Sequence, residues 1–314
     1  MFLKSLNPTQ AEAVTFGDGP LLILAGAGSG KTRVLTARIA YLVLKKGVDP
    51  GNIVAVTFTN KAAGEMRERL NSLIGEQARR LWLGTFHSLG LRLLRTEARS
   101  AGLGAELTVY GDDEQLMLVK EVMKELSINE KTFAPRAVLS KINQAKNEHI
   151  NHTEYANSAG DFLTDRVVKI YSLYQRKLRK MGCLDFGDLI CEPINLLKSN
   201  PAILEKYQRK FQYLLVDEYQ DTNKAQYLLT ELLASGTRNL LAVGDPDQSI
   251  YAWRGADIGN ILDFEKDYPD ATVLRLEQNY RSTKNILSAA NAVIVKNSRR
   301  MEKTLWTENP GGKE

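Results

Sequence analysis

Cysteine and histidine are scarce in this chain of 314 residues, which contains only two cysteines and three histidines. The cysteines, Cys183 and Cys191, have no companion histidine or cysteine at the spacing that metal ligands need. This excludes both a disulfide framework and a zinc site. We expect both thiols to be reduced and structural.

Long apolar runs are also missing. No stretch approaches the ~20 apolar residues of a membrane-spanning helix, and the N-terminal MFLKSLNPTQ lacks the apolar core of a signal peptide. We therefore expect a cytoplasmic protein with no membrane partner. The 43% hydrophobic and 25% charged residues are ordinary for a globular chain of one large or two ordinary domains. The net charge of +5 fits a polyanionic partner but is a weak signal by itself.

A glycine-rich turn between a strand and a helix is the most informative stretch. Residues 21–25 read as a buried strand, and AGAGSGKT (25–32) then runs into a helix that starts near Lys31. Glycine leaves no Cβ in the way, so successive N–H groups can surround a polyphosphate, and the helix N-terminus adds positive charge. Lys31 would contact the β- and γ-phosphates, and the Thr32 hydroxyl would bind Mg²⁺. Ala25 departs from the strict pattern, which has glycine there, and the alternative is a turn without a ligand.

Adjacent carboxylates follow a second apolar strand. Residues 213–217, YLLVD, read as a buried strand ending in Asp217, and Glu218 comes next. Downstream of a phosphate-binding loop, Asp217 can hold Mg²⁺ and Glu218 can orient and deprotonate a water. The alternative is a pair of capping acids on the following helix.

Two later segments combine polar and aromatic residues. GDPDQSIYAWRG (244–255) places the amide of Gln248 shortly before rings that could stack bases, which would couple nucleotide state to the grip on a strand, although such aromatics can equally close a core. EQNYRST (277–283) opens a helix, and there Arg281 could reach the γ-phosphate and Tyr280 could stack on the base.

Between about 109 and 183 the apolar residues have helical spacing, and no strand is expected there. Its many basic residues read as a solvated surface, with some able to touch a nucleic-acid backbone. A helix is expected at 184–197, where the α/β texture resumes. The stretch 308–314 is expected to be a flexible tail without a fold of its own.

Two further groups of polar residues have weaker signals. Gln10 lies in the first turn of a short helix, capped by Asn7, and its amide offers the donor and acceptor that an adenine edge requires. Polar and aromatic residues also follow the expected strands at 53–58 and 81–85, where open α/β sheets bind ligands. These residues are Phe58, Thr59, Asn60 and His87.

Together these stretches resemble the UvrD/Rep/PcrA family of superfamily 1 DNA helicases, over essentially the whole chain. LNPTQAEAV looks like the family's adenine-reading motif, AGAGSGKT like its Walker A, VDEYQDTN like its Walker B, and VTFTNKAA and GTFHS like its first DNA-contact motifs. GDPDQSIYAWRGA and LEQNYRST resemble its third and fourth motifs. Ala25 is usual in this family.

The resemblance implies a role for each matching residue. Those implied to act in phosphate chemistry are Lys31, Thr32, Asp217, Glu218, Gln248 and Arg281. Those implied to bind the nucleotide are Gln10, Ala25, Gly26, Ala27, Gly28, Ser29, Gly30, Lys31, Thr32, Arg33, Tyr280 and Arg281, with Thr32 and Asp217 on the metal. Those implied to contact single-stranded DNA are Phe58, Thr59, Asn60, His87, Tyr251, Trp253 and Arg254.

The implied fold class is α/β, a RecA-like P-loop NTPase domain with a parallel sheet and an all-helical inserted subdomain. The expected segments are a motor domain at 1–108 and 184–280, the insertion at 109–183, and the start of a second motor domain at 281–314. The resemblance implies ATP and Mg²⁺ as cofactors, single-stranded DNA and single-strand/duplex junctions as partners, and 3′ to 5′ translocation with unwinding in repair or replication. Because the family's second motor domain is missing, we expect the N-terminal half of such a helicase, with slow turnover. The alternatives are the motor of a helicase-nuclease and a nucleotide-gated DNA-binding module without productive hydrolysis.

Overall fold

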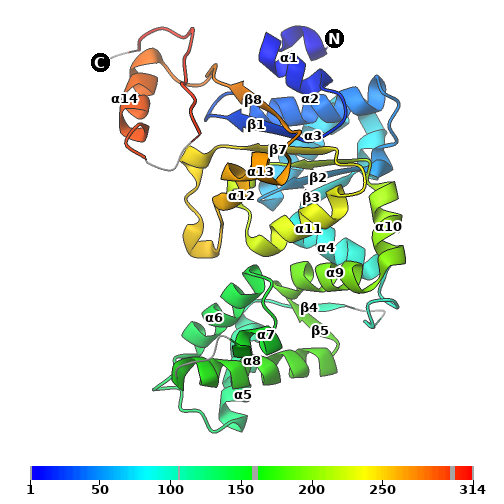
Figure 1. The fold of residues 1–314 in the computed structure, drawn as a ribbon, viewed down its shortest axis with the longest axis vertical. Helices are drawn as coiled ribbons and strands as arrows, with labels where there is room; N and C mark the ends of the chain where they lie inside the picture. Colours follow the sequence, from blue (N-terminus) through cyan, green and yellow to red (C-terminus); the bar gives the residue numbers. More distant parts are fainter. Residues whose placement is uncertain (1, 105–106, 158–161, 298–300, 313–314) are drawn as a thin grey trace. The chain divides into compact units, whose positions relative to one another are not determined.

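A computed structural model of the chain describes residues 2–104, 107–157, 162–297 and 301–312, and these form two compact units (Figure 1). Within the described ranges, the first unit comprises Met1–Phe86, Leu204–Thr222 and Thr230–Glu314, and the second comprises His87–Ile203 and Asn223–Leu229. The second unit is wider than the expected insertion at 109–183.

The first unit is built on a six-stranded parallel sheet, which confirms the predicted α/β class with a parallel sheet. The strand order is β3-β2-β6-β7-β1-β8. The strands are β1 (Leu21–Ala25), β2 (Ile53–Thr57), β3 (Trp82–Thr85), β6 (Tyr213–Val216), β7 (Leu240–Gly244) and β8 (Thr272–Leu276). All the loops that carry the predicted site in this unit follow the carboxyl ends of these strands, where such sheets bind ligands.

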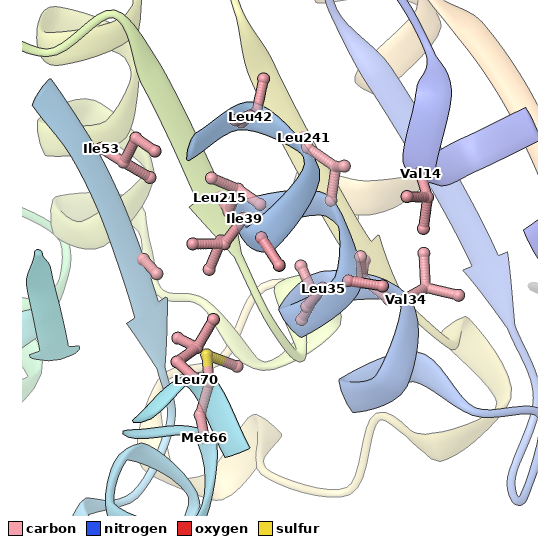
Figure 2. Packing of buried hydrophobic residues seen from close by; sticks show 14 of the residues in the cluster. Val14, Val34, Leu35, Ile39, Leu42, Ile53, Met66, Leu70, Leu215 and Leu241 are labelled. Atoms are coloured by element: carbon pink, nitrogen blue, oxygen red, sulfur yellow. The ribbon is translucent and has the colours of Figure 1, made fainter. Parts of the chain in front are cut away.

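Helices α1 (Pro8–Thr15), α2 (Lys31–Leu44) and α3 (Asn60–Ile74) share one apolar cluster with the sheet. Figure 2 shows Leu35 and Ile39 of α2 beside Leu215 and Leu241 of the strands. All five residues of β1 are buried. Burial at both ends of the turn at 26–30 therefore fixes the position of its backbone.

The remaining helices of the first unit are short or lie near the C-terminal end of the chain. They are α12 (Gly259–Leu262), α13 (Phe264–Asp267) and α14 (Lys284–Ile294). Three further helices run across the boundaries between the two units: α4 (Phe86–Thr96), α10 (Pro201–Lys210) and α11 (Lys224–Ala234).

The second unit is mainly helical, as predicted, but it also contains two strands. Its helices are α5 (Asp112–Glu125), α6 (Pro135–Asn147), α7 (His152–Asn157), α8 (Phe162–Lys180) and α9 (Asp188–Ser199). Strand β4 (Thr108–Tyr110) pairs in parallel with β5 (Cys183–Asp185). The expectation of no strand is therefore wrong at both ends of the region, and the helix expected from 184 begins at Asp188. Each strand has three residues, too few to show a period, and its partner lies more than 70 positions away in the sequence.

The expectation of an unstructured tail is also wrong for the described residues up to 312. The Asn309 side chain donates to the Ser282 carbonyl (3.0 Å), and the backbone N–H groups of Lys284 and Asn285 donate to the carbonyls of Pro310 and Gly311. These hydrogen bonds are made to residues 20 or more positions away, so the local sequence does not show them. Cys183 and Cys191 are free thiols, and within the described ranges we find no helix with the length and apolarity needed to span a bilayer.

Candidate functional site

The turn between β1 and α2, called here the phosphate loop (26–30), is closed by its own hydrogen bonds. The backbone N–H and the hydroxyl of Ser29 both donate to the Gly26 carbonyl, at 3.2 and 2.7 Å. Gly28 and Gly30 have φ angles of +71° and +92°, in the left-handed region that favours glycine. Of the three predicted glycines in this turn, Gly28 and Gly30 are therefore required by their backbone conformation.

Side chains from the C-terminal part of the chain pack closely against the same loop. A Cβ added at Gly26 would meet Leu305, and one at Gly28 would lie 2.7 Å from the amide nitrogen of Asn279. The Asn279 amide donates to the Ala27 carbonyl (2.6 Å), and the Tyr280 N–H donates to the Gly28 carbonyl (3.0 Å). The segment after β8 thus holds the phosphate loop in place.

Replacing Gly30 by alanine is expected to destabilise the protein by about 1–2 kcal/mol, because a residue with a Cβ resists the left-handed conformation. The new Cβ would also lie 2.9 Å from the Gln10 amide nitrogen. We expect nucleotide affinity to fall with stability, measured by urea unfolding and by titration with a fluorescent ATP analogue. Gly64→Ala in α3 is the matched control, since a Cβ there meets nothing within 4 Å. Equal effects of the two substitutions would contradict a special backbone role for Gly30.

The adjacent carboxylates Asp217 and Glu218 lie near Lys31, the first residue of α2. Lys31 Nζ is 2.7 Å from Glu218 Oε2, and the two side chains are 12% and 33% exposed. Glu218 has φ 50° and ψ 47°, a left-handed conformation that is uncommon for a residue with a side chain and that clusters at functional sites. The structure therefore brings Lys31, predicted to bind phosphate, into contact with Glu218, predicted to act on water.

Asp217 lies deeper than its neighbour, at 7% exposure. Burial and the adjacent charge of Glu218 raise its pKa to about 6. A divalent cation would favour the ionised form of such a carboxylate. One oxygen of Asp221, four residues on, is buried without a hydrogen-bond partner among the described residues, and the same two causes raise its pKa to about 6. This donor set fits Mg²⁺, which uses one or two carboxylates together with phosphate oxygens and waters.

A glutamine that the sequence did not indicate connects this pair to the next loop. The Gln220 amide donates to Glu218 Oε2 and to Asp221 Oδ2, both at 3.0 Å. Its carbonyl oxygen accepts from the Asp245 N–H (3.0 Å). Asp245 in turn accepts a hydrogen bond from the Gln248 amide. Gln248 is therefore joined to Glu218 through two intervening residues, Asp245 and Gln220.

Gln10 is fully buried, and both ends of its amide are engaged within the chain. Its nitrogen donates to the Ser29 carbonyl (2.9 Å), and its oxygen accepts from the Asn7 N–H (3.2 Å) in the capping box of α1. One N–H and one lone pair remain, so adenine reading stays a prediction. The hydrogen bond from Gln10 to the Ser29 carbonyl supports the phosphate loop.

The other predicted nucleotide residues lie around the same loop. The Tyr280 hydroxyl accepts from the Asn7 amide and donates to Gln278, both at 2.8 Å, and its side chain is 46% exposed. The Arg281 N–H donates to Asn279 Oδ1 (2.8 Å), and its Cβ lies beside Gly28. The Arg33 guanidinium donates to the Ser5 carbonyl (2.6 Å).

Three of the predicted DNA-binding aromatics form one ring cluster in the first unit. Phe58 and Tyr251 are stacked, with centroids 5.1 Å apart and planes at 23°. Trp253 lies 6.4 Å from Tyr251, and the Arg254 guanidinium lies over both Trp253 (4.6 Å) and Tyr251 (5.0 Å). Trp253 is 75% exposed, so the alternative that these aromatics close a core is wrong for it. Exposed rings with a cation beside them are suited to base stacking.

The other predicted DNA residues are more dispersed. Thr59 caps α3, its hydroxyl accepting from the Ala62 N–H (3.1 Å), and Asn60 is the exposed first residue of that helix. His87 belongs to the second unit, where its ring meets Phe186 edge to face at 5.9 Å. Desolvation lowers the pKa of His87, so its ring is neutral at pH 7. The sequence does not predict the contact of His87 with Phe186, which is 46% exposed, because a lone aromatic in GCLDFGDL carries no motif signal.

Comparison with known proteins gives consistent matches. A family model described as the UvrD/REP helicase N-terminal domain matches residues 6–269. The chain is 54% identical over 310 residues to the ATP-dependent DNA helicase PcrA of Bacillus subtilis, covering 99% of this chain and 42% of that protein. It is also 54% identical over 312 residues to the ATP-dependent DNA helicase PcrA of Staphylococcus aureus, covering 99% and 43%. The chain thus spans less than half the length of these curated relatives.

Proposed function

This chain belongs to the UvrD/REP helicase family, and from that premise we propose that it is the nucleotide-binding and DNA-binding part of an ATP-dependent DNA helicase. Its cofactors are ATP and Mg²⁺, and its partners are single-stranded DNA and single-strand/duplex junctions. Translocation from 3′ to 5′, a role in repair or replication and a cytoplasmic location belong to the same proposal. Within it, residues 281–314 begin a second motor domain.

One observation carries this proposal: a continuous set of contacts runs from the phosphate loop to the loop of the ring cluster. Lys31 pairs with Glu218, Gln220 joins Glu218 to Asp245, and Asp245 holds Gln248. The rings of Tyr251 and Trp253 follow within five residues of Gln248 on the same loop. A change at the phosphate end therefore reaches the residues that would grip bases.

The roles of the chain's own groups follow from this geometry. When bound, ATP would supply the phosphoanhydride bond that is cleaved, and Mg²⁺ would neutralise part of the phosphate charge. Thr32 and Asp217 would hold the metal, and Lys31 would leave Glu218 to bind phosphate. Glu218 is then free to accept the proton of an attacking water.

Two donors would respond to the terminal phosphate. The Gln248 amide now donates to Asp245, and a γ-phosphate oxygen is an alternative acceptor for it. Arg281, beside Gly28, supplies a cation that stabilises charge on the transferred group. Loss of that phosphate would return Gln248 to Asp245 and alter the loop that carries Tyr251.

Replacing Trp253 by alanine tests the DNA part of the proposal. We expect affinity for fluorescently labelled oligo-dT to fall about 5- to 150-fold, since stacking is worth ~1–3 kcal/mol per base, and nucleotide affinity to stay within about twofold. Fluorescence anisotropy and ATP-analogue titration measure the two. Ile250→Ala removes an exposed apolar neighbour (69% exposed) without a ring and is the control. An equal loss of both affinities would make Trp253 a packing residue.

The same oligonucleotide titration, repeated at rising salt, checks the electrostatic part. Contacts to phosphates release counterions, so affinity should fall linearly on a log–log plot. Stimulation of ATP hydrolysis by the oligonucleotide supports a motor. Binding of nucleotide and DNA without any turnover would favour the gated binding module.

A further inference from the structure

Lys303 is a buried cation on a segment that the motifs did not indicate. Its side chain is 3% exposed, and Nζ lies 2.5 Å from Asp245 Oδ1 and is also paired with Asp247 Oδ2. Those aspartates are 4% and 8% exposed. A lysine held this deep between two carboxylates is in a fixed position, because leaving either carboxylate unpaired and buried is unfavourable.

The carboxylate of Asp245 is oriented from both sides. Its Oδ1 faces Lys303 and accepts from the Asp247 N–H (3.0 Å), and its Oδ2 accepts from the Gln248 amide. The carboxylate cannot rotate without breaking contacts on both oxygens. Lys303 and the Asp247 N–H together therefore fix Oδ1, which leaves Oδ2 facing Gln248.

The segment that carries Lys303 is bound to the strand end that carries Tyr280 and Arg281. The Thr304 N–H donates to Glu277 Oε1 (2.9 Å), and the Trp306 N–H donates to the Glu277 carbonyl (3.0 Å). The Asn279 N–H donates to the Trp306 carbonyl (2.7 Å). Leu305, between Thr304 and Trp306, lies against Gly26 of the phosphate loop. Lys303 thus links the 277–281 segment to the 245–248 loop.

We propose that Lys303 is a positioning residue that holds the 245–248 loop against the 277–281 segment, so that Gln248 and Arg281 respond to the γ-phosphate together. The inference rests on the proposed function, because it deepens the coupling between nucleotide and DNA. Lys303 touches neither nucleotide nor DNA in this role. It acts through Asp245.

The test uses four variants of the chain. Lys303→Met removes the cation, and Lys303→Arg keeps it. Lys303→Met with Asp247→Asn removes one buried carboxylate as well, which restores charge balance but not the link. Lys296→Met, at an exposed lysine of the same region, is the control.

Two readouts are measured. The first is hydrogen exchange of peptides covering 244–252 without nucleotide, which we expect to be about tenfold faster in Lys303→Met and unchanged in Lys296→Met. The second is the ratio of oligo-dT affinities with a non-hydrolysable ATP analogue and with ADP, expected to differ about 5-fold or more in the unaltered chain and to approach one in both Lys303→Met variants. Lys303→Arg should retain part of the difference.

Thermal stability separates positioning from mere folding. We expect the melting temperature to fall in Lys303→Met and to recover in the double variant, while the affinity ratio stays near one in both. Recovery of the ratio together with stability would overturn the proposal, as would normal exchange at 244–252 in Lys303→Met. If the unaltered chain shows no nucleotide-dependent DNA affinity, the proposed function is what fails, and the exchange measurement alone decides the position of Lys303.

Discussion

Replacing Glu218 by glutamine is expected to lower the rate of DNA-stimulated ATP hydrolysis by about 10²–10⁴-fold, the usual contribution of a general base. Glutamine has the same size but cannot accept the proton of water. Release of labelled phosphate measures slow turnover with enough sensitivity for this comparison.

Nucleotide affinity, unlike the hydrolysis rate, should not fall in Glu218→Gln. Glu218 Oε2 is 2.7 Å from Lys31 Nζ in the structure and competes with phosphate for that cation. Glu218→Gln removes the competing charge, so affinity for an ATP analogue is expected to match or exceed that of the unaltered chain. The control is Glu265→Gln, an exposed glutamate of α13 in the same unit. A parallel loss of affinity and rate would make Glu218 a structural partner of Lys31 rather than a base.

The parts of this fold that the sequence predicts are those in which the signal is local. Strands β1, β2 and β6 are runs of four or five apolar residues followed by polar ones, and the structure places each within one residue of the expected bounds. The phosphate loop and the Asp217–Glu218 pair are each contiguous in the sequence. Their contact through Lys31 follows because β1 and β6 both pair in parallel with β7, so all three strands end at the same edge of the sheet.

The parts that the sequence does not predict depend on partners far away along the chain. Asn279 holds Ala27 across 252 positions, and Lys303 meets Asp247 across 56. Neither residue type at its position carries a periodic or motif signal for such a contact. Gln220 lies inside the Walker B stretch, yet its role appears only when β7 brings Asp245 beside it. The sequence predicts a solvated surface for the basic residues between about 109 and 183, and this is wrong for Lys146, which is 2% exposed.

Lys146→Met is expected to have the largest effect on stability, a loss of about 3–5 kcal/mol, because it leaves two carboxylates buried without their cation. Lys146 Nζ lies 2.6 Å from Asp185 Oδ2 and 2.7 Å from Asp188 Oδ1. Tyr174 donates to Asp185 (2.9 Å) and Gln175 to Asp188 (3.0 Å), so the cluster joins α6, α8, β5 and α9. Urea unfolding measures the loss, and Lys177→Met is the control, since Lys177 is partly exposed and pairs with two exposed glutamates, Glu121 and Glu125.

The pH dependence identifies the cause of that loss. Burial and the charge of Asp185 already raise the pKa of Asp188 to about 6, although Lys146 opposes the shift. A carboxyl whose pKa is raised on folding favours the folded state at low pH and loses that contribution as the pH rises through the folded value. Lys146 also holds the pKa of Asp185 below its usual value against the effect of burial. Without Lys146 both pKa values rise, so the deficit of Lys146→Met should be smallest in acid, where both carboxyls are protonated, and should grow as the pH rises towards neutrality and beyond.

A triple variant separates charge burial from packing. Adding Asp185→Asn and Asp188→Asn to Lys146→Met leaves no buried charge, so much of the lost stability should return. Lys146 and Asp188 also border a cavity of about 480 Å³ in the second unit, which has room for water. A deficit below about 1 kcal/mol in Lys146→Met, independent of pH, would mean that water in this cavity replaces the ammonium group. The cluster would then orient the four elements without being the source of their stability.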